Sequence, residues 1–302
     1  MTDLRALRRL EPVFSRAPSA HNTQPWTLHY EPDHVVLEFD PARWLSASDP
    51  TRRDLELSLG AFAEAVLIAA AEEGLALRFE GDRFVPAETV YETAFTGADL
   101  EHRRTSRLPY EPGRIEDIAA ARAQLRDGET LHELSARSVV ELFSRADRHV
   151  YESPPVVQEL RAWLRLDPRD PRYTEDGLNA ECLDLSRLEA RALSLALRPR
   201  VLPFARGALT AASSRVLRRD HSILVLEGPP DDVRESGRSL LRVWLALDRA
   251  GYRTHPLSQL IDSDDSAGAL AEQLSVTRER LLAVFRAGSS PEPARSHRLT
   301  PP

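Results

Sequence analysis

The sequence predicts an α+β fold in which helices wrap a mixed or antiparallel sheet. Two short runs, Trp26–Tyr30 and Val35–Phe39, flank a four-residue loop and predict a β-hairpin. The alanine- and leucine-rich stretch Arg53–Ala71 predicts a central buried helix. The apolar run Ser222–Leu226 predicts a buried strand, and the periodic stretch Asp231–Arg249 after it predicts an amphipathic helix.

Periodicity and turn signals predict the remaining elements. In chain order we expect a helix over Asp3–Phe14, strands over Leu75–Glu80 and Thr89–Phe95, helices over Glu116–Leu125, Leu131–His149, Pro155–Leu164 and Ala267–Gln273, and a strand over Leu281–Phe285. The segment Arg165–Gly177 is rich in Asp, Arg and Pro, which predicts a long mobile loop. Such a loop is either a lid over an active site or a plain surface excursion.

Length and charge limit the class of protein. With 302 residues and 42% hydrophobic content, the chain can build one large domain or two small ones with a filled core. The net charge of -7 argues against a general nucleic-acid binder, which relies on clustered positive charge. The N-terminus has no basic segment followed by an apolar run, and no stretch approaches the roughly 20 apolar residues of a membrane span. We therefore expect a cytoplasmic protein without a membrane partner.

Cysteine and lysine usage excludes several kinds of site. Cys182 is the single cysteine, which excludes an internal disulfide and any multi-cysteine metal site, and it is most simply a small buried residue. All 40 basic residues are arginine. The chain therefore has no lysine for Schiff-base chemistry or for a Walker-type phosphate site, whereas the guanidinium fork of arginine remains available for phosphate.

The segment Arg16–Trp26 combines small residues, short polar side chains and two prolines in one stiff turn. Proline fixes φ, and Ser, Asn and Gln side chains add directed donors and acceptors. Such a turn can lie against a flat polar ligand, or it can be a simple helix-to-strand connection closed by a buried tryptophan. The residues that would contact the ligand are Pro18, Ser19, Ala20, Asn22 and Gln24.

A second motif, Arg103–Arg107, concentrates positive charge in a loop. The guanidinium groups of Arg103 and Arg107 can make bidentate, charge-assisted hydrogen bonds to a phosphate, and Thr105 can add a hydroxyl donor. The alternative is an exposed basic loop, which is what most short charge runs are.

The stretch Ala17–Trp26 resembles the flavin-contacting turn of the nitroreductase superfamily of FMN enzymes, and Arg103–Arg107 resembles the phosphate motif of that family. The resemblance implies two further contacts. Ser258 and Gln259, in a segment similar to the one that follows the family's long helix, would approach the redox edge of the flavin; otherwise they belong to a helix-to-strand loop. Arg298, with Arg295 as a possible second contact, would return to the phosphate from the C-terminal tail; otherwise the tail is a frayed terminus.

The order of the motifs implies a fused pseudo-dimer. In the family, the turn and the phosphate motif usually come from two subunits, whereas here both lie in one chain. We therefore expect two nitroreductase-like halves, residues 1–98 and 99–302, and a monomer that can hold FMN. This arrangement most resembles the single-chain Acg-like group, some members of which have a lid and are thought to hold flavin without turnover.

The resemblance implies ping-pong hydride transfer from NAD(P)H through FMN to a small organic acceptor, such as a quinone, a nitroaromatic or a pathway-specific substrate. The flavin performs the difficult chemistry, so no acid or base side chain is assigned. Two alternatives stay open. The protein is a non-enzymatic flavin store with a lid, or it is a structural relative that has lost FMN.

Overall fold

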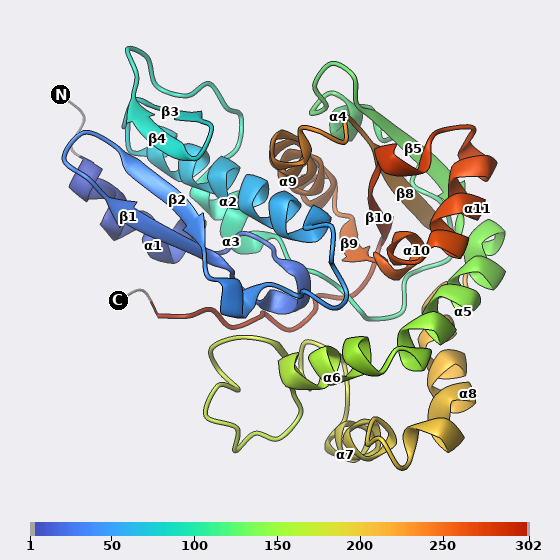
Figure 1. Ribbon diagram of the computed structural model, residues 1–302. Helices are drawn as coiled ribbons and strands as arrows, with labels where there is room; N and C mark the ends of the chain where they lie inside the picture. The colour runs from blue at the N-terminus through green and yellow to red at the C-terminus, as the bar shows by residue number, and fades with distance from the viewer. Residues whose placement is uncertain (1–3, 301–302) are drawn as a thin grey trace.

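The strands form two antiparallel four-stranded sheets, each built within one part of the chain (Figure 1). The structure is a computed structural model and describes residues 4–300. In spatial order, the first sheet contains β1 (Trp26–Tyr30), β2 (Val35–Phe39), β4 (Arg83–Pro86) and β3 (Leu77–Glu80). The second contains β5 (Thr130–Ser135), β8 (Ser222–Glu227), β10 (Leu281–Gly288) and β9 (Arg253–Pro256). A short parallel pair, β6 (Leu164–Arg165) and β7 (Leu178–Asn179), joins the two ends of a long loop.

Helices cover both sheets and form a separate group beyond the second one. Their bounds are α1 (Leu7–Phe14), α2 (Arg53–Glu72), α3 (Gly97–His102), α4 (Ala119–Arg122), α5 (Ala136–Glu152), α6 (Pro154–Trp163), α7 (Arg187–Ala196), α8 (Leu202–Ser213), α9 (Val233–Arg249), α10 (Gln259–Asp262) and α11 (Asp264–Leu274). Figure 1 shows α6, α7 and α8 gathered away from the two sheets, with the long loop beside them.

The closest packing in the fold is between α2 and α9. Helix α2 lies against the first sheet, and α9 lies between α2 and the second sheet (Figure 1). Two glycines allow this approach: a Cβ on Gly60 would lie 1.8 Å from the carbonyl oxygen of Arg234, and a Cβ on Gly237 would lie 2.4 Å from that of Leu57. The predicted buried helix Arg53–Ala71 thus meets α9 through direct backbone contact.

Aromatic contacts fix the turn that follows α1. The Trp26 ring stacks on Phe62 of α2 with centroids 4.5 Å apart, and Phe14 of α1 meets the same ring edge-on at 5.4 Å. Such pairs contribute beyond their area of contact. Both ends of the turn are therefore held against α2.

Most of the predicted elements are present. The structure confirms the hairpin, the two long helices, the helix over Pro154–Trp163, the buried strand β8 and the loop after Arg165. Gly251 has φ +83° where it ends α9. The first predicted helix is present from Leu7, after a 3₁₀ turn over Leu4–Ala6, and its first residue, Asp3, lies outside the described residues.

Three sequence predictions were wrong. Residues 89–95 form no strand, because the chain already reverses at Gly81 (φ +64°) and β4 pairs with β3 there. Thr130–Ser135 is strand β5 and not the start of a helix: it pairs with β8 along its whole length, and the Ser135 hydroxyl then caps α5 by accepting the N–H of Arg137. The helix predicted over 116–125 is the single turn α4.

Within residues 4–300, none of the helices combines the length and apolar composition that a bilayer-spanning segment requires.

The close contact between α2 and α9 at Gly60 and Gly237 predicts that a larger residue there lowers the free energy of unfolding. Gly237→Ala should lower the free energy of unfolding by about 1–3 kcal/mol, because the added methyl group meets rigid backbone and not a side chain that could move. Denaturant unfolding measures this. The control is Gly268→Ala in α11, where a Cβ has no neighbour within 4 Å. It should be neutral or stabilising by up to about 1 kcal/mol, and equal effects of the two variants would contradict the packing argument.

Candidate functional site

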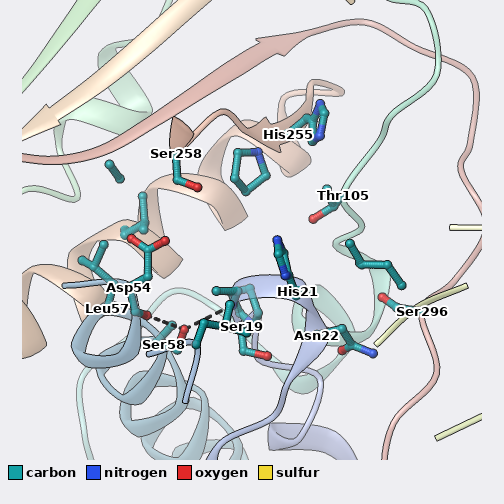
Figure 2. Close-up of a pocket in the computed structure, with 18 of the residues that line it drawn as sticks. Ser19, His21, Asn22, Asp54, Leu57, Ser58, Thr105, His255, Ser258 and Ser296 are labelled. Carbon is teal, nitrogen blue, oxygen red and sulfur yellow. Dashed lines mark hydrogen bonds between the residues drawn. The ribbon is translucent and has the colours of Figure 1, made fainter. Parts of the chain in front are cut away.

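A cavity of about 310 Å³ lies where the turn after α1, the start of α2, the segment after α3, the β9–α10 connection and the C-terminal tail converge (Figure 2). This volume falls in the usual range of small-molecule sites. The structure brings ten of the twelve predicted site residues to its wall: Pro18, Ser19, Ala20, Asn22, Arg103, Thr105, Arg107, Ser258, Gln259 and Arg298. Gln24 and Arg295 do not line it; Gln24 is buried behind the turn and Arg295 is exposed.

The turn that borders the cavity has an unusual backbone. His21, Asn22 and Gln24 have φ values of 47°, 55° and 51°, in the left-handed region that non-glycine residues seldom adopt. Residues held in this way cluster at functional sites. His21 points into the cavity in Figure 2, and its Nδ1 is buried without a hydrogen-bond partner. Burial and the charge of Arg107 lower the pKa of His21, which keeps the ring neutral.

The side chains of Asn22 and Gln24 connect the turn to the long loop and to the tail. Asn22 Nδ2 donates to the carbonyl oxygens of Gly177 (3.2 Å) and His297 (3.1 Å). Gln24 Nε2 donates to the carbonyl of Glu175 (2.9 Å), and Gln24 Oε1 accepts the N–H of Leu299 (2.9 Å). These amides are therefore engaged in joining three chain segments.

A buried ion pair anchors the long loop. Arg165 and Asp176 are almost completely buried, and Arg165 Nη2 lies 2.7 Å from Asp176 Oδ1. Arg43, which follows the first hairpin, donates to the other carboxylate oxygen of Asp176 at 3.1 Å. The loop thereby brings Leu178 and Cys182 to the cavity wall. The sequence predicts the loop. The Arg165–Asp176 pair joins its two ends, and the bond from Arg43 ties Asp176 to the segment that follows the first hairpin.

One end of the cavity is strongly cationic. Arg103 is 5% exposed, and its Nε and Nη1 are buried without a partner. Arg107, four residues further along, is half-buried and donates one hydrogen bond, from Nη1 to the carbonyl of Cys182 at 3.1 Å. In the described part of the chain, neither guanidinium forms a salt bridge. Burial lowers the pKa of Arg103 to about 10, and burial also lowers that of Arg107.

Arg298 holds the tail against the end of α1. Its Nε donates to Ser15 O (2.7 Å), and its Nη2 donates to Arg16 O (3.1 Å) and Ala17 O (3.2 Å). Its Nη1 donates to Asn22 Oδ1 (2.8 Å) and to His297 O (2.9 Å). A guanidinium has five N–H groups, and all five are used here. Arg298 thus adds positive charge to this end of the cavity while its hydrogen bonds go to the protein. The tail is therefore bound to the end of α1 and is not a frayed terminus, which was the alternative in the sequence analysis.

The opposite end of the cavity carries three carboxylates. Arg53, the first residue of α2, pairs with Asp54 (2.8 Å) and with Asp262 of α10 (2.6 Å). Asp49 accepts the N–H of Leu55 through Oδ2 (2.9 Å), but its Oδ1 is buried without a partner. Burial and the neighbouring Asp54 raise the pKa of Asp49 to about 7. The carboxylates lie on separate elements, so no linear motif in the sequence could have revealed them.

Two further cavity residues were not assigned from the sequence. Trp244 lies in α9, within the stretch predicted as an amphipathic helix; it lines the cavity, and its indole Nε1 is buried without a partner. The Arg103 guanidinium lies 5.7 Å from its ring centroid. His255 lies in a segment expected as a loop, which is strand β9. Among residues 4–300, no cluster of His, Cys, Asp or Glu side chains is suited to a metal ion.

Comparison with curated proteins finds similarity to nitroreductases. One relative, named "Putative NAD(P)H nitroreductase Rv3131" from Mycobacterium tuberculosis, is 31% identical over 152 residues, which cover 44% of this chain and 43% of the relative. Another from the same organism, "Putative NAD(P)H nitroreductase acg", is 35% identical over 108 residues, covering 32% of this chain and 33% of the relative. The matches thus span less than half the length of either relative. No protein-family model matches the chain. The resemblance to nitroreductases read from the sequence is confirmed.

The raised pKa of Asp49 predicts how the free energy of unfolding depends on pH. The folded-state pKa of Asp49 is raised to about 7, above the value of about 4 in an unfolded chain. The native state therefore binds more protons than the unfolded state between these pH values, and this group lowers stability as pH rises through that window. Asp49→Asn removes the titration, so the stability of the variant relative to wild type should increase from pH 4 to pH 7. Unfolding free energies at pH 5 and pH 8 measure this, and a difference that does not change with pH would contradict it.

Proposed function

We propose that this chain is an FMN-binding oxidoreductase of the nitroreductase type, which passes hydride from NAD(P)H to a small organic acceptor such as a quinone or a nitroaromatic. The observation that carries the proposal is a pair of guanidinium groups, the buried Arg103 and the half-buried Arg107, which line one cavity and form no salt bridge within residues 4–300. The names of the relatives, which describe NAD(P)H nitroreductases, support the reaction class.

The chemistry of the cationic end fits a phosphate monoester. An uncompensated buried charge is costly, and a dianion bound there would remove that cost. Arg103 has two N–H positions free for such a ligand, and arginine pairs with phosphate in a bidentate way. Thr105 lies between the two arginines in sequence and lines the same wall. These residues would hold the FMN phosphate, whereas Arg298, whose donors are used, would contribute charge and hold the tail.

The other walls would hold the rest of the cofactor. The turn Pro18–Asn22 would lie along the flavin ring, and Ser258 and Gln259 at the start of α10 would border its redox edge. When bound, FMN supplies the hydride transfer. The task of the protein is then to orient the ring, to exclude water and to leave room for the two substrates in turn. The strained backbone at His21 and Asn22 is consistent with a turn shaped for a ligand and not only for the fold.

We also propose that the chain contains two nitroreductase-like halves, residues 1–98 and 99–302. The first sheet lies within residues 26–86 and the second within residues 130–288. Each half would contribute one wall of the site. The first half would supply the turn Pro18–Asn22, and the second half would supply the phosphate-binding segment Arg103–Arg107. A single chain would then suffice to hold FMN.

A second candidate function is flavin storage without turnover. The observation that favours it is the docked loop, which Asn22, Gln24 and Arg43 all bond from the first half. A fixed cover at the cavity edge would retain flavin but restrict access for a second substrate. Oxidation of NADPH in the presence of a quinone distinguishes the two candidates, since a store would give none above the rate of free FMN.

The proposed function predicts the identity of the bound cofactor. Mass spectrometry of ligand released from the purified or reconstituted protein should find FMN. Arg103→Ala should weaken FMN binding by about 1.5–3 kcal/mol, the usual contribution of a hydrogen bond to a charged group. Fluorescence quenching during titration measures the dissociation constant.

Arg114→Ala is a matched control for this variant. Arg114 is an exposed arginine that pairs with Glu133 and does not line the cavity. It should leave the FMN dissociation constant unchanged. Equal affinities of wild type and Arg103→Ala would reject the phosphate assignment, and failure to bind FMN after reconstitution would reject the proposed function.

The one-chain site predicts how cofactor occupancy responds to dilution. Because both walls would belong to one chain, FMN should stay bound while the protein sediments as a monomer. A site completed by a second chain would instead lose FMN as dimers separate, by mass action. Sedimentation velocity with flavin absorbance over a wide dilution range separates these outcomes.

A further inference from the structure

We propose that His255 is an additional ligand for the phosphate at the cationic end of the cavity, and that the buried Arg286 fixes its ring as the Nε2–H tautomer. The inference rests on the proposed FMN site and adds to it a neutral hydrogen-bond donor. His255 is thus a binding residue, and Arg286 is a positioning residue that acts through it.

The hydrogen bond between these residues determines the tautomer. Arg286 of β10 and His255 of β9 are cross-strand partners, and Arg286 Nε donates to His255 Nδ1 at 3.0 Å. A guanidinium has no acceptor atom, so His255 Nδ1 must accept and carries no proton. The neutral ring then has its proton on Nε2. Within residues 4–300, His255 Nε2 has no protein hydrogen-bond partner.

Contacts on all sides hold the Arg286 side chain, so its Nε–H keeps facing Nδ1 of His255. Its side chain is completely buried. Nη1 donates to Val216 O (3.2 Å), and Nη2 donates to Ser106 O (3.2 Å) and Leu108 O (3.1 Å). Its guanidinium carbon lies 4.1 Å from the ring centroid of Tyr110, a favourable cation–π contact. Three backbone carbonyls and one aromatic ring thus fix the Nε–H that faces His255.

His255 lies beside the segment Arg103–Arg107 in the wall of the cavity. The neighbouring Thr254 forms a parallel bridge with Thr105, and its carbonyl accepts the N–H of Ser106 at 3.0 Å. This pairing brings His255 beside the phosphate-binding segment, and both His255 and Thr105 line the cavity. Figure 2 shows the two residues on the same side of it. A phosphate bound by Arg103, Thr105 and Arg107 would therefore lie within reach of His255.

The charges around His255 keep it neutral. Arg286 of β10, Arg107 of the phosphate-binding segment and His221, next to β8, all face it, and Tyr110 packs on Arg286 and near His221. Burial, followed by the charges of Arg286 and Arg107, holds the pKa of His255 well below its usual value, while burial lowers the pKa of the nearby His221 to about 4. The ring can therefore donate a hydrogen bond to an anion without adding a buried charge to a wall that already carries several. The Nε2–H group of His255 should therefore stay protonated, and the ring should stay neutral, across the neutral pH range.

The tautomer is testable without any cofactor. In the protein free of flavin, ¹⁵N NMR of histidine, with the signal of His255 assigned by its loss in His255→Gln, should show the Nε2–H tautomer and no titration between pH 5.5 and 8. An Nδ1–H ring, or a ring that titrates in this range, would overturn the positioning role of Arg286. In Arg286→Met, which removes the donor, the signal should change tautomer or begin to titrate. If this variant does not fold, the wild-type spectrum still decides the question.

The role in phosphate binding is tested by comparing FMN with riboflavin, which lacks the phosphate. His255→Leu should weaken FMN binding about tenfold, the effect of losing one hydrogen bond to a charged group, and should leave riboflavin binding unchanged. His255→Gln, which restores a side-chain N–H donor, should recover part of the loss. Equal effects on both ligands, or no effect on FMN, would overturn the phosphate role. Absence of FMN binding in wild type would instead reject the proposed function, while the tautomer would stand on its own measurement.

Discussion

The burial of Arg103 and the partial burial of Arg107 and Arg298 at the wall of one cavity, without a salt-bridge partner among residues 4–300, is the constraint on which the rest of the site depends. Arg16, Arg103, Arg107 and Arg298 form no salt bridge in the part of the chain that the structure describes. Burial, together with repulsion from neighbouring arginines, lowers the pKa of Arg16 to about 10 and that of Arg298 in the same direction. Burying such a set is unfavourable unless an anion neutralises it. The turn, the segment Arg103–Arg107 and the tail converge on this one site, which accounts for their long-range contacts.

The packing of α2 on α9 sets the distance between the two sides of the site. Asp54, Leu57 and Ser58 reach the cavity from α2, and Leu240 and Trp244 reach it from α9. The glycine contact fixes this spacing through backbone and not through flexible side chains. A ligand would therefore meet a preformed cavity, so that little binding energy would be needed to order it. The acidic residues at the other end, with Asp49 close to its titration midpoint near neutral pH, make the two ends electrostatically different.

Much of the site could be predicted from local sequence, whereas its connections could not. The hairpin, α2 and α9 follow from hydrophobic periodicity, and the two short motifs supply eight of the residues that line the cavity. Strand β5 was taken for a helix because its identity depends on pairing with β8, which lies about 90 residues further along. The bonds from Asn22 to residues 177 and 297, and the pairing of Arg286 with His255, depend on register between distant segments. No local pattern encodes such contacts.

A crystal structure of the protein with FMN is the most direct test of the central claim, which is that the arginine end of the cavity binds a phosphate monoester. Phosphate oxygens should lie within hydrogen-bond distance of the free Nε and Nη1 of Arg103, with Arg107 and Thr105 beside them and the flavin ring along Pro18–Asn22. A phosphate that lies in solvent or near Asp49, or a flavin bound outside this cavity, would contradict it.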